Sequence, residues 1–292
     1  MPGVSPARLS AARTPCYPAG TVNRSLRRFF FRAQAVAFLL SCILPDLAAD
    51  PSKAMPRGPG LLAAAYPEQV AAWDGGSITL RAGAVLPFTL GYRASDFEDS
   101  LEHADLRDQL SQPYPRADVW PAPKVNEDPG RLRSEAFFMA MYGSTAEEVK
   151  RHLVPVHWLK RNKGPLLLVT SVNHVDEALQ AVSDEIESRP WLIGFVDHPV
   201  GTFAWRTVEG ARRLSMHSFG IALDINESFS DYWLWDQEKG IRAGSSRIPI
   251  ELVEIFERHG FIWGGKWYHF DTMHFEYRPE LLAASTANGP KR

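Results

Sequence analysis

Two short segments of the chain carry ionisable side chains inside otherwise apolar, strand-forming sequence. Residues 215–224 contain His217, and residues 269–276 contain Asp271 and His274. Burying such groups without partners costs several kcal/mol, so the folded chain must bring partners to them. A metal ion suits two imidazoles and a carboxylate, and three protein ligands with an open fourth position are the arrangement of catalytic zinc. The two segments are therefore expected to meet at one buried point.

The spacing within each segment limits the backbone that could build such a site. His217 and Asp224 are seven residues apart, so on one continuous strand they would face opposite sides. They converge only if His217 lies in the loop before Gly220 and Asp224 lies inside the strand. Asp271 and His274, three apart, share a face only in a turn or helical bend, where Asp271 would sit over the bound water as a general base. Spacing alone leaves a metal-free, hydrogen-bonded core arrangement equally open.

The two motifs resemble a known family. The pattern S-x-H-x-x-G-x-A-x-D, followed by D-x-x-H-F-E, is similar to the zinc D-alanyl-D-alanine carboxypeptidase (VanY-type) family. That family also includes D-Ala-D-Ala dipeptidases and the L-alanyl-D-glutamate endopeptidases of phage lysins. The resemblance covers roughly residues 130–282. It implies a hedgehog-like fold, a zinc cofactor and a peptidoglycan peptide as substrate.

The resemblance also implies roles for individual residues. His217, Asp224 and His274 would bind one Zn²⁺ per chain, and Asp271 would be the catalytic base. Ser215 would be a polar contact to substrate.

Two further positions matter for the reaction. Arg206 takes the place of the family's transition-state-stabilising arginine, with Arg212 and Arg213 as rival candidates. Asp271 departs from the Glu that the dipeptidases and many carboxypeptidases carry, whereas the endopeptidase branch more often shows Asp. We therefore expect a D-alanyl-D-alanine carboxypeptidase, with an L-alanyl-D-glutamate endopeptidase as the alternative.

Two other classes of protein remain as alternatives. A non-catalytic zinc-binding or cell-wall-binding module would not need Asp271 over an open metal position. A serine hydrolase using Ser215 or Ser218 would be expected to carry a G-x-S-x-G elbow, which neither serine has. Both are therefore less favoured than a metallopeptidase.

The first 49 residues differ in charge from the rest of the chain. They hold six Arg, no Lys and one acid, and without them 26 basic and 33 acidic residues remain. Arg27-Arg28 precede an apolar run, residues 33–44, that is too short to span a membrane comfortably. This pattern predicts a signal segment, similar to the twin-arginine type, and an exported protein, periplasmic or extracellular. Neither a nucleic-acid partner nor a membrane span in the mature chain is expected.

Both cysteines lie within this leader, at Cys16 and Cys42. A mature chain beginning near Asp50 would have no disulfide and no thiolate metal ligand. A lipid anchor at Cys42 is the alternative, although the bulky residues around it favour a cleaved signal.

The order of apolar segments lacks a βαβ rhythm and favours an α+β fold with a mainly antiparallel central sheet flanked by helices. We predict a leader at 1–49, an N-terminal extension of unknown function at 50–129, a catalytic domain at 130–284 and a tail at 285–292. Strands are expected at 77–80, 84–88, 154–158, 166–172, 191–195, 201–205, 220–225 and 274–277. Residues 50–66 are expected to form a linker. Helices are expected to begin further along the chain, at Ser95, Asp128-Pro129, Ser144, Asn173 and Pro249.

His269 and a group of five tryptophans each allow two interpretations. His269 is expected either to bond a reaction intermediate or to pack. Trp205, Trp233, Trp235, Trp263 and Trp267 are expected mainly in the core, with a peptide or sugar groove as the alternative.

Overall fold

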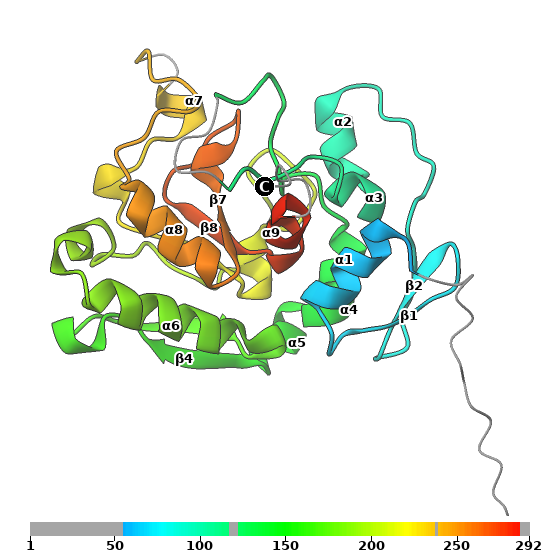
Figure 1. The fold of residues 1–292 in the computed structure, drawn as a ribbon, viewed down its shortest axis with the longest axis horizontal. Helices are drawn as coiled ribbons and strands as arrows, with labels where there is room; N and C mark the ends of the chain where they lie inside the picture. The colour runs from blue at the N-terminus through cyan, green and yellow to red at the C-terminus, as the bar shows by residue number, and fades with distance from the viewer. Residues whose placement is uncertain (1–54, 117–121, 237–238, 287–292) are drawn as a thin grey trace, which may run out of the picture. The chain divides into compact units, whose positions relative to one another are not determined.

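The computed structural model describes residues 55–116, 122–236 and 239–286 (Figure 1). The predicted leader and both cysteines lie outside the described residues. The described residues belong to one compact unit, and the predicted domain boundaries stay a prediction. Among the described helices, none is long and apolar enough to cross a membrane.

The described residues form helices and short strands. The α-helices are α1 (Arg57–Ala65), α2 (Phe97–Glu102), α3 (Leu106–Gln109), α4 (Glu135–Tyr142), α5 (Ala146–Lys150), α6 (Val175–Glu187), α7 (Trp233–Asp236), α8 (Ile250–Arg258) and α9 (Pro279–Thr286). The strands are β1 (Val70–Trp73), β2 (Ser77–Leu80), β3 (Val85–Pro87), β4 (Leu153–His157), β5 (Leu166–Thr170), β6 (Ala222–Asp224), β7 (Phe261–Trp263) and β8 (His274–Tyr277). Short 3-10 helices lie at Lys160–Asn162, Val172–His174, Pro190–Phe195, Met216–Phe219, Glu227–Phe229 and Gly264–Lys266.

The strands pair in three small antiparallel sheets, in the orders β1-β2-β3, β4-β5 and β6-β8-β7. This mixture of helices with antiparallel sheets agrees with the predicted class, although three small sheets replace one large central sheet. The hedgehog-like arrangement stays a prediction.

The sheet β6-β8-β7 separates the hydrophobic core from the site. Its middle strand, β8, alternates in burial direction as a strand must. Phe275 stacks on Phe256 of α8, with ring centroids 3.9 Å apart. Its neighbours His274 and Glu276 face the other side, where they line a pocket. Alternation along one strand therefore supplies both an apolar anchor and two polar site residues.

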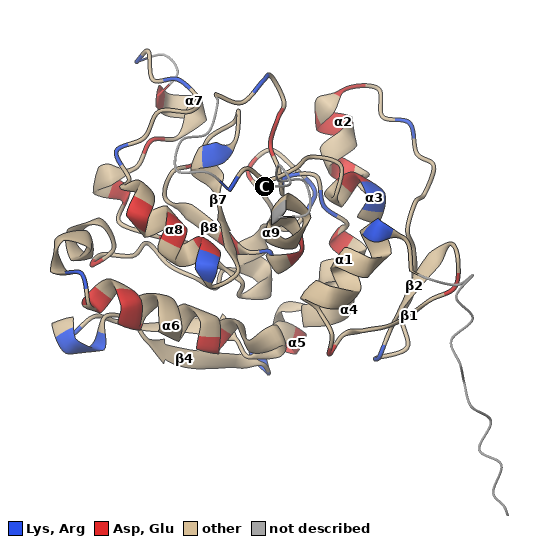
Figure 2. Ribbon diagram, viewed as in Figure 1, with Lys and Arg blue, Asp and Glu red and all other residues tan. Residues whose placement is uncertain are grey.

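Helix α6 covers the ribbon β4-β5 (Figure 1). Its buried residues include Leu179, Val182 and Ile186, which follow the helical period predicted from the sequence. Asp176 and Glu177 lie in its first turn, where negative charge is favourable at the positive end of the helix dipole. The charged residues of α6 are acidic, as Figure 2 shows.

The segment before residue 116 is joined to the rest of the unit by buried polar contacts. Helix α1 packs on α9. The Tyr66 hydroxyl donates to Glu280 Oε2 over 2.6 Å, and Gln109 Nε2 donates to Glu280 Oε1 over 3.0 Å. Gln109 Oε1 in turn accepts from the backbone N–H of Ser134, just before α4. These contacts tie the N-terminal residues to the start and end of the region predicted as the catalytic domain.

Several predicted elements are confirmed. The hairpin near residue 80 forms from β2 and β3, and β4 pairs with β5. Helix α8 follows Pro249, and β8 has the predicted bounds.

Other elements differ for local reasons. The segment 57–65, predicted as linker, is α1, because Pro59 falls in the first turn, where proline is tolerated, and Leu62 is fully buried. The segment 191–195, predicted as a strand, belongs to a 3-10 helix, since a short apolar run has no decisive period. The predicted strand 201–205 makes only one bridge, from Gly201 to Asp224.

The starts of three helices also differ from the predicted positions. The N-caps are Asp96 and Thr145, each one residue after the predicted serine. The helix expected from Asp128 begins only at Glu135, because the Asp128 carboxylate is bound to His269.

Four elements were not anticipated from the sequence. They are β1, α7, β7 and α9, and α9 extends to Thr286, within the predicted tail.

A test of the N-terminal attachment compares two tyrosines. Tyr66→Phe leaves a buried carboxylate with one donor fewer, so the free energy of unfolding should fall by about 1–3 kcal/mol in urea titrations. Tyr92→Phe removes an exposed hydroxyl bound to Asp99, and should change it by less than about 0.5 kcal/mol. Equal effects of the two substitutions would contradict a stabilising role for the Tyr66 contact.

Candidate metal centre

His217 lies on a tight turn ahead of β6. It belongs to the 3-10 helix Met216–Phe219, whose N-cap Ser215 accepts a hydrogen bond from the His217 N–H. Gly220 ends this helix at φ +67°, and a Cβ there would lie 2.7 Å from Leu153 Cδ2. Only glycine suits this position, where the chain reverses into the strand. Asp224 then falls at the end of β6, which confirms the loop-then-strand geometry required by the spacing.

His274 enters the site from β8. The His274 N–H donates to the Asp271 carbonyl in the turn before the strand, as the three-residue spacing required. In the ladder between β6 and β8, Asp224 and His274 are direct partners. Directly opposed residues of antiparallel strands project to the same face, so register alone brings this carboxylate and imidazole together.

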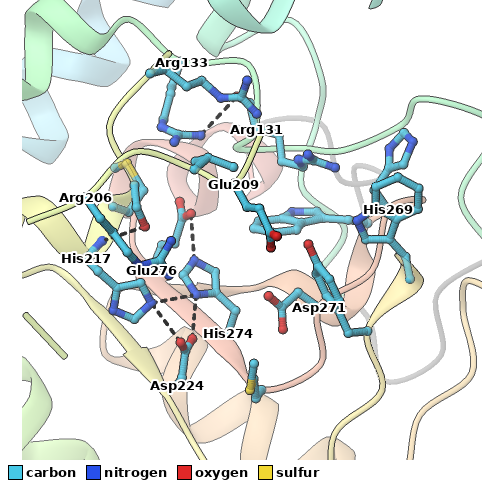
Figure 3. Close-up of a pocket in the computed structure, with 18 of the residues that line it drawn as sticks. Arg131, Arg133, Arg206, Glu209, His217, Asp224, His269, Asp271, His274 and Glu276 are labelled. Atoms are coloured by element: carbon cyan, nitrogen blue, oxygen red, sulfur yellow. Dashed lines mark hydrogen bonds and ion pairs between the residues drawn. The ribbon is translucent and has the colours of Figure 1, made fainter. Parts of the chain in front are cut away.

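Three side chains offer metal-binding atoms at one point (Figure 3). His274 Nδ1 lies 2.8 Å from Asp224 Oδ1, His217 Nε2 lies 3.0 Å from Asp224 Oδ2, and the two nitrogens are 3.3 Å apart. Ligand atoms about 2.1 Å from a tetrahedral zinc ion are about 3.4 Å from one another. The donor set and its spacing therefore fit a metal ion of that kind after small outward movements.

In each histidine, the ring nitrogen that points away from the cluster (the outer nitrogen) also makes a hydrogen bond. His217 Nδ1 donates to the Thr202 carbonyl, and His274 Nε2 donates to Glu276 Oε1 over 3.0 Å. Such contacts fix the tautomer of an imidazole and orient its other nitrogen toward a metal. The inner atoms are thus His217 Nε2 and His274 Nδ1.

The electrostatics of the cluster favour a cation. Burial opposes ionisation of Asp224, yet its contacts with His217 and His274 hold its pKa well below the usual range. Burial likewise lowers the pKa of His274, but the carboxylates of Asp224 and Glu276 outweigh it and raise this pKa well above its ordinary value. The pocket side of the cluster therefore presents negative charge that a proton or a metal ion can neutralise.

Asp271 is the remaining carboxylate beside the cluster. It lines the same pocket, and its Oδ1 is buried without a hydrogen-bond partner among the described residues. Burial raises the pKa of Asp271 to about 6, with the negative charge of Asp224 adding to the effect and His274 opposing it. A buried carboxyl with a pKa near neutrality can accept and return a proton.

All the residues predicted for the site line one pocket. They are Arg206, Ser215, His217, Asp224, Asp271 and His274. Of the rival arginines, Arg213 also lines it, whereas exposed Arg212 is ion-paired with Glu102 and is not among the lining residues.

Ser218 is buried and serves the backbone. Its hydroxyl donates to the Arg206 carbonyl and accepts from the Arg206 N–H. It does not line the pocket, which removes it as a nucleophile.

The aromatic residues divide between the two predicted uses. Trp233, Trp235 and Trp267 line the pocket, while Trp263 is fully buried in the core. His269 lines the pocket with Nδ1 bound to Asp128, so it combines a fixed orientation with access to the pocket.

Two arginines of the pocket were missed. Arg131 and Arg133 precede α4 and line the pocket beside Arg213. Their only sequence signal is a pair of alternate arginines after the proline-rich stretch, with no motif around them.

The raised pKa of Asp271 predicts a pH-dependent stability difference in metal-depleted protein. Below pH 3.8 the carboxyl is protonated whether folded or unfolded, but above about 6 burial of its charge destabilises the fold by about 3 kcal/mol. Asp271→Asn should therefore gain about 3 kcal/mol of unfolding free energy relative to the parent between pH 4 and pH 8. Denaturant titrations at both pH values measure this, and a difference that does not vary with pH would contradict the assignment.

Comparisons with known proteins agree with these motifs. A family model described as D-alanyl-D-alanine carboxypeptidase matches residues 209–277. The peptidoglycan L-alanyl-D-glutamate endopeptidase CwlK of Bacillus subtilis (strain 168) is 36% identical over 67 residues, which are 22% of this chain and 40% of that protein. The chain thus spans less than half the length of this relative, and no solved structure gave a significant match. The match of residues 209–277 to the D-alanyl-D-alanine carboxypeptidase family model confirms the resemblance seen in the two motifs.

Proposed function

We propose that this protein is a zinc metallopeptidase that hydrolyses peptidoglycan stem peptides as a D-alanyl-D-alanine carboxypeptidase. The observation that carries the proposal is the placement of a His–Asp–His cluster and a buried, partly unpartnered carboxylate in one pocket. The family match of residues 209–277 supports the same reaction class.

The residues fit zinc as the metal. His217 Nε2, His274 Nδ1 and Asp224 would hold it, and residues 50–292 contain no cysteine that could supply a thiolate instead. Nitrogen and carboxylate ligands are normal for catalytic zinc, which keeps a fourth position open. The chemistry that bound zinc supplies is Lewis acidity, which polarises a scissile carbonyl and lowers the pKa of water.

The other predicted site residues transfer a proton, stabilise negative charge or contact the substrate. Asp271 accepts the proton of the attacking water on Oδ1 and passes it to the leaving amine. The guanidinium of Arg206, exposed in the pocket, stabilises the developing oxyanion. Its backbone is held by Ser218 and by the Ser215 N–H, so its position is defined from the metal-binding turn. The Ser215 hydroxyl retains a proton that it can donate to substrate.

An L-alanyl-D-glutamate endopeptidase is the second candidate. Two observations favour it: the aspartate at position 271 and the similarity to the L-alanyl-D-glutamate endopeptidase of Bacillus subtilis. A non-catalytic zinc-binding or wall-binding module fits less well, because it gives no reason to bury Asp271 with an unpartnered oxygen.

Metal analysis tests the ligand assignment. Purified protein should hold about one Zn²⁺ per chain, and His217→Ala or His274→Ala should lose it. Asp271→Ala should keep the zinc while kcat/KM falls by about 10²- to 10⁴-fold. Unchanged zinc content in both histidine variants would show that the ligands lie elsewhere.

The cleaved bond can be read from products. Mass spectrometry of purified muropeptides after incubation should show loss of a single D-alanine from pentapeptide stems. Cleavage between L-Ala and D-Glu would instead support the endopeptidase. Intact products from zinc-loaded protein would favour the non-catalytic module.

We also propose that the protein is exported, by a signal segment at 1–49 that resembles the twin-arginine type. N-terminal sequencing of the protein from its native host should find a start near Asp50. A cytosolic protein that begins at Met1 would contradict export, and a lipid on Cys42 would indicate the anchored form.

A further inference from the structure

Four guanidinium groups line the pocket, and the reaction described above uses only one of them. Arg206 is assigned to the oxyanion, which leaves Arg131, Arg133 and Arg213 without a function. Figure 3 shows Arg131 and Arg133 across the pocket from the His217–Asp224–His274 cluster.

Arg131 and Arg213 each have a buried donor without a hydrogen-bond partner among the described residues, and Arg133 is buried without an ion pair there. Arg133 is 6% exposed and donates to two carbonyls, Leu214 O over 2.9 Å and Arg131 O over 3.3 Å, but has no ion pair among the described residues. Arg213 is ion-paired with Glu102 through Nη1, while its Nε has no hydrogen-bond partner. Arg131 Nη1 is also buried without a hydrogen-bond partner, although it lies 3.9 Å from Asp128 Oδ2.

Arg131 and Arg213 have ion pairs with Asp128 and Glu102, but the charge of Arg133 has none among the described residues. Burial and the nearby guanidiniums lower the pKa of Arg133 to about 9, and Glu276 opposes the shift. Glu276 is already bound to His274 and Arg278. Asp224 and Asp271 belong to the metal cluster and the proposed base, and Glu209, which also lines the pocket, is exposed. A buried cation without a partner is strongly destabilising, so an anion supplied by the ligand would relieve this arrangement.

We propose that Arg133, with Arg131 and Arg213, binds the α-carboxylate on the substrate residue whose nitrogen becomes the leaving amine. Guanidinium groups match carboxylates in geometry and charge. The anchor of Arg133 is the carbonyl of Leu214, three residues before His217, so the carboxylate is held close to the metal cluster. This inference rests on the proposed function.

The same chemistry occurs in both candidate substrates. In a D-Ala-D-Ala stem the α-carboxylate belongs to the terminal D-alanine. In an L-Ala-D-Glu bond it belongs to the D-glutamate, whose chain continues through its side-chain carboxyl. The subsite therefore selects a free carboxylate beside the scissile nitrogen, whichever of the two bonds is cleaved.

A binding measurement on metal-depleted full-length protein tests the subsite without turnover. N-acetyl-D-alanine and its primary amide are the probes, and NMR titration gives the two dissociation constants. The parent should bind the acid about 10- to 100-fold more tightly than the amide, as expected for a hydrogen-bonded charge pair. Arg133→Gln should abolish this preference. Arg212→Gln is the matched control, because Arg212 is near Arg213 but outside the pocket lining, and should retain it.

A kinetic measurement identifies the source of the carboxylate. Zinc-loaded protein is given a pentapeptide stem and its C-terminal amide, then L-Ala-γ-D-Glu and L-Ala-γ-D-isoglutamine peptides. Within the substrate pair that the enzyme cleaves, the parent should have a kcat/KM about 100-fold lower for the amide than for the free acid. Arg133→Gln should show little difference between the two substrates. If Arg133→Gln fails to fold, by circular dichroism, Arg131→Gln replaces it, since Arg131 is less buried.

The two proposals fail in different ways. A parent that binds acid and amide equally, or a folded Arg133→Gln that keeps the preference, overturns the carboxylate subsite even if wall peptides are cleaved. A parent that prefers the acid but cleaves no wall peptide supports the subsite and contradicts the peptidase function.

Discussion

Asp224 and His274 face each other across the paired strands β6 and β8, with 2.8 Å between carboxylate and imidazole. From this contact a line of alternating charge runs through Glu276, Arg278 and Glu280, all buried. Removing one member of such a line leaves an uncompensated buried charge, which is far more destabilising than replacing a surface pair. The line ends on contacts from Tyr66, the C-cap residue of α1, and Gln109 of α3, so the orientation of a metal-binding histidine depends on residues near the start of the described chain.

Local sequence signals account for the elements around the site. The apolar period of α6, the proline before α8 and the alternation of β8 each determine a structure that packing then reinforces. The failures have a common cause, because tertiary contacts override weak local preferences. Helix α1 forms where prolines and glycines predict a linker, since Leu62 is buried against the rest of the unit. Asp128 resembles a helix cap, yet its carboxylate is used by His269.

The metal cluster could be predicted because its three ligands fall within two motifs whose spacing demands a turn at Gly220 and a turn before His274. The arginines could not, because Arg131 and Arg133 lie more than 70 residues before the first ligand, and no local pattern records a contact made only after folding. Arg133 reaches the site through Leu214, which shares no motif with it. The burial of Arg133 without an ion pair among the described residues, and of Arg131 Nη1 without a hydrogen-bond partner, are three-dimensional properties that distinguish these side chains from ordinary surface arginines.

A crystal structure of the purified protein, with anomalous diffraction recorded on both sides of the zinc absorption edge, tests the central claim most directly. The account predicts one zinc peak, about 2.0–2.2 Å from His217 Nε2, His274 Nδ1 and an Asp224 oxygen. It also predicts that the outer nitrogens of both histidines remain bound to Thr202 and Glu276. A zinc peak elsewhere, or a metal bound through the outer nitrogens, would contradict it.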